Sequence, residues 1–154
     1  MDKLEIQERI LKMLPQISFF GGADEGELDQ IMEYVDEVEV EAGNYIYREG
    51  DPPGDLYILL EGEMEFYILK EKVAGGEPGI LFGMSAAIGI QKQLVSALAK
   101  TDVKLAVISK RLFMTMCKKN PELFGKVILN VARDLARDLK FLREYVKEHK
   151  KSCG

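Results

Sequence analysis

The run of residues 79–96 constrains this chain most, because it is the longest nearly uncharged stretch in a strongly charged protein. Gly79, Gly83 and Gly89 let its backbone approach another group closely. At Gly83 a flexible residue precedes small helix formers, so a short helix can begin there with its first N–H groups free. The run therefore predicts a buried pocket wall suited to an anion, although a purely structural turn is the commoner explanation of such a motif.

The length of 154 residues allows one well-buried core and argues against two separate domains. We expect N-terminal helices over residues 1–35, a strand-rich body over 36–109 and C-terminal helices over 110–154, all in one domain. No run approaches the roughly 18 uncharged residues that a membrane helix requires. The N-terminus also lacks the cationic start and apolar core of a secretory signal. These features predict a cytoplasmic protein with no membrane partner.

Charge is distributed unevenly along the chain. Residues 22–65 contain fifteen acidic side chains and one basic side chain, whereas residues 118–154 contain ten basic and five acidic side chains. The acidic half would repel nucleic acid, so we expect no nucleic-acid partner. The basic excess is explained by solvated lysines on a long helix, or alternatively by an acidic protein partner.

Residues suited to catalysis or metal binding are sparse. His149 is the single histidine and lies in a lysine-rich tail, so a histidine-based metal site or histidine-dependent catalysis has nothing to build on. Cys117 and Cys153 are far apart, which predicts reduced thiols rather than a disulfide framework. We therefore expect no metal and no enzyme.

The hydrophobic pattern predicts short helices followed by many short strands. Helical spacing over residues 3–14 ends at Pro15, and Asp24 can cap a second helix. Apolar and polar residues then alternate, which predicts strands over 36–41, 45–48, 56–60, 64–68, 95–99 and 103–108. We expect Glu61 and Gly62 to form a tight hairpin and residues 73–78 to form a loop tip. Many short strands with close turns indicate a sandwich or jelly-roll barrel.

The C-terminal part predicts two further helices, capped by Ser109 and by Asn120 with Pro121 at the first helical position. The second helix is long and carries an apolar stripe with steps of three or four residues. About three heptads suffice for a short coiled-coil seam, so we expect a homodimer, unless the helix packs on its own barrel. The expected interface residues are Phe124, Ile128, Val131, Leu135, Leu139 and Leu142.

Several motifs resemble those of cyclic nucleotide-binding domains. Residues 41–51, 54–59 and 61–62 resemble the first hairpins of that family, and Phe82 with Gly83, Thr101 with Asp102, and residues 120–123 follow in the family's order. The resemblance implies a jelly-roll barrel with flanking helices and a phosphate-binding cassette at residues 82–96. It also implies a C-terminal helix that closes over the bound ligand. The expected ligand is a cyclic nucleotide or another small anion.

Two residues depart from the family's pattern. Members that bind cyclic AMP or cyclic GMP usually place a glutamate after Phe-Gly to hold the ribose and an arginine to pair with the phosphate, but this chain has Met84 and Gln93. Lys92 is adjacent and can supply charge, or it is simply a solvated loop residue. The candidate pocket residues are Phe82, Gly83, Met84, Ser85, Ala86, Lys92, Gln93, Leu94, Ser96, Asp138 and Leu139.

The sequence therefore predicts a noncatalytic regulatory module whose cyclic nucleotide binding is weak, altered or lost, and which acts through conformation or a protein partner. The alternative is the ligand-binding part of a catabolite activator-type transcription regulator, whose DNA-binding segment this chain does not contain. A cupin-type oxygenase or isomerase would need clustered histidines and carboxylates inside the barrel, which the sequence does not offer.

Overall fold

The computed structural model describes residues 4–5, 8, 24–33, 35–84, 88–89 and 91–153. Two four-stranded antiparallel sheets form its body. The first sheet has the order β1 (Val35–Val40), β8 (Val103–Ile108), β3 (Leu56–Glu61) and β6 (Leu81–Phe82). The second has the order β2 (Tyr45–Tyr47), β7 (Ser96–Ala99), β4 (Met64–Ile68) and β5 (Glu71–Gly76).

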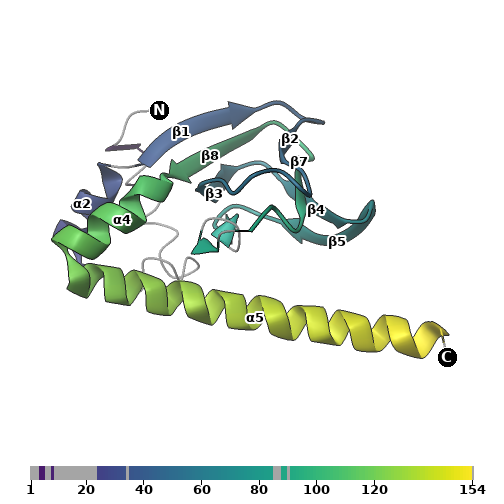
Figure 1. Cartoon of the computed structure of the whole chain (residues 1–154). Coiled ribbons are helices and arrows are strands. Elements are labelled where there is room, and N and C mark those ends of the chain that lie inside the picture. The colour runs from purple at the N-terminus through teal and green to yellow at the C-terminus, as the bar shows by residue number, and fades with distance from the viewer. Residues whose placement is uncertain are drawn as a thin grey trace.

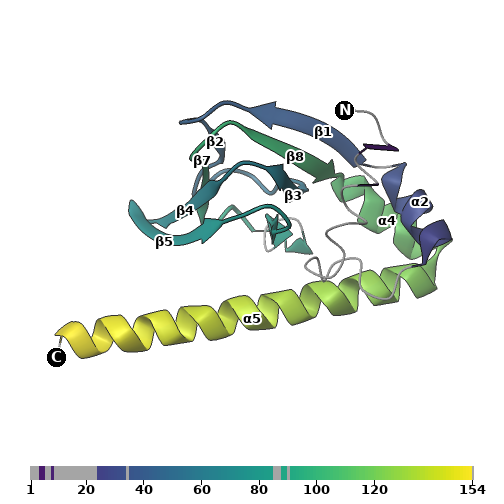
Figure 2. The same ribbon diagram turned by 180° about the vertical axis from the view of Figure 1, so that it is seen from behind.

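Three helices flank the sandwich. Helices α2 (Glu25–Met32) and α4 (Lys110–Lys119) lie together at one end, and α5 (Pro121–Cys153) runs along one side of the strands and past the end of the β4 and β5 pair (Figures 1 and 2). Its 33 residues give a length of about 50 Å at a rise of 1.5 Å per residue. The helix expected over residues 3–14 falls largely outside the described residues.

The predicted helix starts are confirmed by their capping contacts. The Asp24 carboxylate accepts a hydrogen bond from the Glu27 N–H at 2.8 Å, which begins α2. The Ser109 hydroxyl accepts one from the Arg111 N–H at 3.0 Å, and the Asn120 side chain accepts one from the Leu123 N–H at 3.2 Å. These side chains satisfy N–H groups that the first helical turn leaves unpaired.

The core has two parts that share strand β3. Leu56, Ile58 and Leu60 face one way and pack with apolar residues of the three helices, whereas Leu59 faces the space between the two sheets. Burial on both faces explains why the β3 sequence is apolar throughout rather than alternating. It also ties the helices to the sandwich, because Leu123, Val127 and Val131 of α5 belong to the first part.

Two turn predictions are wrong. Glu61 and Gly62 do not form a hairpin, because β3 pairs with β8 and β6 whereas β4 pairs with β5 and β7. The turn instead carries the chain from one sheet to the other. Gly62 has a φ of +94°, and a Cβ atom there would lie 2.4 Å from the Asp102 carbonyl oxygen, so only glycine fits.

The predicted loop tip at residues 73–78 is also wrong, because residues 71–76 form β5 and pair with β4. Glycines are unfavourable in strands, but the backbone ladder to β4 outweighs this preference. The tip lies at Leu69 and Lys70, which adopt φ values of 50° and 67° without the glycine or asparagine usual in such turns. The absence of that signal explains the error.

Candidate ligand-binding site

A cavity of about 310 Å³ lies between the strands of the second sheet, strand β6, residues 93–95 and helix α5. This volume is at the lower end of the range of about 300–1,000 Å³ typical of small-molecule sites. Six of the residues predicted from the sequence line it: Phe82, Gly83, Met84, Gln93, Leu94 and Asp138. The structure therefore brings the cassette and the long helix together around one space.

Other predicted residues lie elsewhere. Lys92 and Leu139 are exposed and do not line the cavity. Ser96 is on β7, where its hydroxyl accepts a hydrogen bond from the Glu49 N–H at 3.0 Å, so its role there is to fix the neighbouring turn. Ser85 and Ala86 are outside the described residues, and so are their N–H groups, whereas Gly83 and Met84, whose N–H groups the sequence also suggested for anion binding, are described.

Gln93 is held in place by two backbone hydrogen bonds. Its N–H donates to the Asp51 carbonyl at 2.9 Å, and its carbonyl accepts from the Gly50 N–H at 2.9 Å. The side chain is only 6% exposed and lines the cavity. This position is thus rigid and buried, but its carboxamide is uncharged and cannot form a charge-assisted bond to a phosphate.

Met84 is 6% exposed and belongs to the same core cluster as the helices. Its side chain therefore makes an apolar contact between the cavity and the helical core. The preceding Gly83 has a φ of +85°, and a Cβ atom there would lie 2.8 Å from the Asp55 carbonyl oxygen. Glycine at this position is required by the backbone, whether or not a ligand binds.

Aromatic rings form much of the barrel side of the cavity. The rings of Phe66 and Phe82 meet edge to face at 5.5 Å, and Tyr47 lies 6.2 Å from Phe82 in a tilted arrangement. Tyr57 stacks on the Phe82 ring at 5.3 Å and supports it. Burial raises the pKa of Tyr47 far above its ordinary value, and the nearby Tyr57 raises it further, so Tyr47 acts as a neutral side chain.

Sequence reasoning missed several residues of the cavity wall. Phe66 was assigned only to strand alternation, and Leu135 and Leu142 were assigned only to a dimer seam. Phe141 was not assigned any role. Positions 135, 138 and 142 are three and four residues apart, which places them on one helix face, so the sequence carried a signal for the helix side of the cavity.

The described lining of the cavity carries little charge. Within the described part of the chain, no lysine or arginine lines it, and Asp138 is its one acidic residue. Burial raises the pKa of Asp138, the nearby Asp134 raises it further, and Arg137 opposes these effects. Arg137 forms an ion pair with Asp134, which limits the charge it offers to Asp138.

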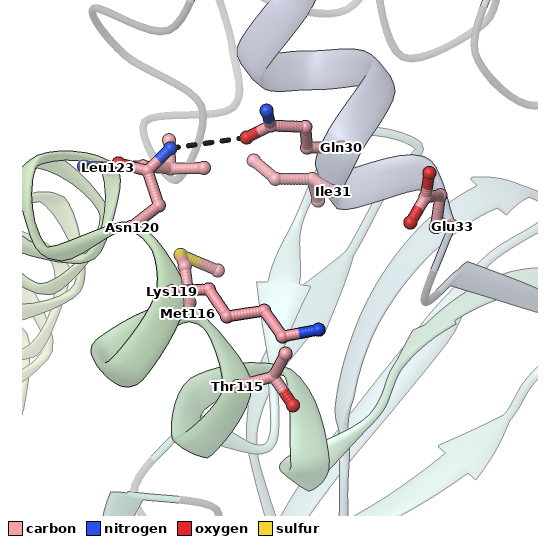
Figure 3. A pocket seen from close by; sticks show the side chains of 8 residues that line it. All are labelled: Gln30, Ile31, Glu33, Thr115, Met116, Lys119, Asn120 and Leu123. Atoms are coloured by element: carbon pink, nitrogen blue, oxygen red, sulfur yellow. Dashed lines mark hydrogen bonds between the residues drawn. The ribbon is translucent and has the colours of Figure 1, made fainter.

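A second cavity of about 310 Å³ lies where α2, α4 and α5 meet (Figure 3). The Asn120 amide donates a hydrogen bond to the Gln30 side chain at 3.1 Å across it. Asn120 also caps α5, and Ile31, Met116 and Leu123 belong to the helical core. These contacts connect the three helices, and none of the predicted ligand residues lies there.

Other kinds of site find no support among the residues that the structure describes. No group of three or more His, Cys, Asp or Glu side chains there is arranged to hold a metal ion. No described helix is long and apolar enough to cross a membrane.

Comparison with known proteins identifies the family. Residues 37–120 match the model of the cyclic nucleotide-binding domain, so the chain belongs to that family of regulatory, noncatalytic domains. A cAMP-dependent protein kinase regulatory subunit from Emericella nidulans is 34% identical over 83 residues, which are 53% of this chain and 20% of that protein. The chain thus spans about a fifth of the length of this curated relative.

Solved structures confirm the predicted jelly-roll type of fold with a long C-terminal helix. A cyclic nucleotide-binding domain from Methylobacillus flagellatus has a TM-score of 0.83 at 22% identity, covering 94% of this chain and 84% of that one. The regulatory subunit of a cAMP-independent protein kinase A from Trypanosoma brucei has a TM-score of 0.71 at 25% identity, covering 95% of this chain and 50% of that one.

Proposed function

We propose that the chain is a regulatory module in which ordinary cyclic nucleotides bind weakly or not at all. The observation that carries this proposal is the chemistry at the two anchor positions: Met84 is buried in an apolar cluster, and Gln93 is fixed but uncharged. A charge-assisted hydrogen bond contributes about 1.5–3 kcal/mol. Loss of two such bonds weakens binding by about a hundredfold or more.

The relationship to a regulatory subunit described as cAMP-independent is consistent with this proposal, since it shows that the fold occurs in a protein of that description. Calorimetric titration of the purified chain with cyclic AMP, cyclic GMP and cyclic dinucleotides tests it directly. We expect no binding below about 100 μM, in line with the loss of two charged contacts. Submicromolar binding of cyclic AMP would overturn the proposal.

We further propose that the chain acts through a protein partner in the cytoplasm, as one domain made of residues 1–35, 36–109 and 110–154. The curated relatives are regulatory subunits of a protein kinase, which supports a partner protein rather than DNA. The common core of α2, α4, α5 and the first sheet supports a single cooperative unit. The signal would be a movement of α5 against the cassette. A ligand can shift the equilibrium between two arrangements of α5 only if it binds one of them more tightly than the other.

Dimerisation through α5 is part of the same proposal, with a revised interface. Of the predicted stripe, Val131 is only 1% exposed, and Phe124 and Leu135 pack on the chain's own core. The exposed apolar residues lie further along the helix and include Leu139 and Val146. We therefore place the contact between two copies on the second half of α5.

Light scattering at tens of micromolar protein tests this interface. We expect a dimer, and we expect Leu139→Asp combined with Val146→Asp to give monomers. These two residues are preferable to Leu135, since Leu135 lines the cavity and contacts the core. A monomeric parent protein, or an unchanged mass in the double variant, would rule the seam out.

A further inference from the structure

The charges around the cavity restrict the class of ligand it can hold. The polar side chains in its described lining are those of Tyr47, Gln93 and Asp138, and only Asp138 is acidic. Within the described part of the chain, the Asp138 carboxylate makes no hydrogen bond or ion pair. An anion entering this space would lie beside an unpaired carboxylate and would meet no lysine or arginine among the described lining residues.

The chemistry of the lining favours an apolar aromatic molecule. Phe66 and Phe82 form an edge-to-face pair on the barrel side, and Phe141 lines the cavity from α5 on the other side. Leu94, Phe141 and Leu142 line the cavity yet remain 59%, 49% and 41% exposed. A planar ring between the two walls would cover this apolar surface and stack against the aromatic side chains.

We propose that this cavity selects an uncharged planar aromatic ligand carrying a hydrogen-bond donor for Asp138, and that it rejects anions of the same shape. The inference rests on the proposed function, because it uses the absence of the charged phosphate anchor at position 93. It goes further by naming the ligand class that the altered site accepts. Asp138 then provides both the acceptor for the ligand and the charge that repels anions.

Two dyes with one ring system test the charge selection. N-phenyl-1-naphthylamine is uncharged and has one N–H donor, and 8-anilino-1-naphthalenesulfonate adds a sulfonate to the same rings. Fluorescence titration should show the uncharged dye binding at least about tenfold more tightly, because the sulfonate meets a carboxylate without a compensating cation. Equal or tighter binding of the sulfonate dye would overturn the proposal.

Matched substitutions identify the residue responsible. Asp138→Asn removes the carboxylate charge with little change in shape. It should reduce the ratio of the two dyes' dissociation constants by at least about threefold. Asp36→Asn makes the same charge change on exposed strand β1, away from α5 (Figure 1), and should leave the ratio unchanged. An equal effect of both substitutions would show that net charge, rather than the cavity, controls binding.

The position of the dye is checked by two methionines. Met84 lines the cavity, whereas Met114 on α4 is 64% exposed and does not. With methyl-labelled methionine, the uncharged dye should shift the Met84 signal in an NMR spectrum and leave the Met114 signal in place. The reverse pattern would place the dye outside the cavity and overturn the proposal.

The two proposals fail in different ways. If neither dye binds and cyclic AMP does not bind, the inferred ligand class is wrong, but the weak nucleotide binding stands. If cyclic AMP binds with submicromolar affinity, the proposed function is wrong and the inference that rests on it is lost as well.

Discussion

The two halves of helix α5 carry similar apolar spacing but lie in different surroundings. In residues 121–135, Leu123, Val127 and Val131 are buried against α2, α4 and the first sheet. In residues 136–153, Leu139 and Val146 are exposed, although they continue the same stripe. Apolar spacing therefore predicts that a helix face will be covered, but not whether its own domain, a ligand or a second chain covers it.

This difference assigns separate roles to the two halves. The first half is part of the core, so its contacts contribute to the folding free energy. The second half borders the cavity through Asp138, Phe141 and Leu142, next to Leu135 at the end of the first half, and its C-terminal turns contact strand β5. We therefore expect a ligand or partner to reposition this part of the helix without unfolding the domain.

The largest expected effect comes from restoring both charged anchors. Met84→Glu together with Gln93→Arg should strengthen cyclic AMP or cyclic GMP binding by about 3–6 kcal/mol, the contribution of two charge-assisted hydrogen bonds. Calorimetry measures the gain. Hydrogen exchange with saturating nucleotide should then show added protection in residues 136–146 and little change in residues 121–131.

Each single change serves as a control for the pair. Gln93→Arg alone should give a smaller gain, and Met84→Glu alone should lower stability because its carboxylate enters an apolar cluster without a partner. If the double variant folds by circular dichroism but gains no affinity, bulky residues near the cassette close the site. Uniform protection of the whole helix would contradict the separation into two halves.

The next largest effect compares two leucines of the same helix. Leu123→Ala should lower the free energy of unfolding by about 2–5 kcal/mol, because it leaves a cavity in the core. Leu139→Ala should change it by no more than about 0.5 kcal/mol, since the residue is exposed. Urea denaturation at low protein concentration, where dimers dissociate, gives both values. Equal losses would mean that the second half is also part of the core.

A smaller effect is expected where the second half contacts the barrel. The His149 ring lies 3.7 Å from the Glu71 carboxylate and stacks on Tyr145 at 3.8 Å. The nearby Glu71 raises the pKa of Tyr145, although the Tyr145 hydroxyl lies outside hydrogen-bonding geometry. Glu71→Gln should increase hydrogen exchange in residues 143–150 while changing global stability by less than about 1 kcal/mol.

Glu148→Gln is the control for the Glu71 substitution. It removes one charge from the last turns of α5 and leaves Glu71 unchanged. It should leave the exchange of residues 143–150 close to that of the parent protein. If the two variants behave alike, the helix charge determines the exchange rather than the contact with β5.

The smallest effect concerns Asp138 and depends on pH. Because its pKa is raised in the folded state, the ionised carboxylate destabilises the fold above that pKa, and this penalty disappears below the ordinary pKa of aspartate. Asp138→Asn should therefore be slightly more stable than the parent at pH 7, and the difference should vanish as the pH falls below about 4. Urea midpoints at the two pH values measure it, and a difference that grows at low pH would refute the assignment.

Much of the fold was predictable because its signals are local. Capping residues such as Asp24, Ser109 and Asn120 fix helix starts through contacts within three residues. The strands were recognisable from alternation, and β3 from its continuous apolar character. The turn at Gly62 was misjudged because local sequence indicates a reversal but does not say which strand pairs with which.

The site was predictable only where one short segment supplies it. The resemblance to the family predicts from the sequence that Met84 and Gln93 stand at the anchor positions, and neither side chain carries charge. Tertiary structure decided that Met84 packs into the helical core, that Ser96 fixes a turn, and that Phe66 and Phe141 face one cavity from opposite sides. The reason is physical: side-chain chemistry and local backbone preference are encoded residue by residue, whereas burial and enclosure depend on which distant segments pack together.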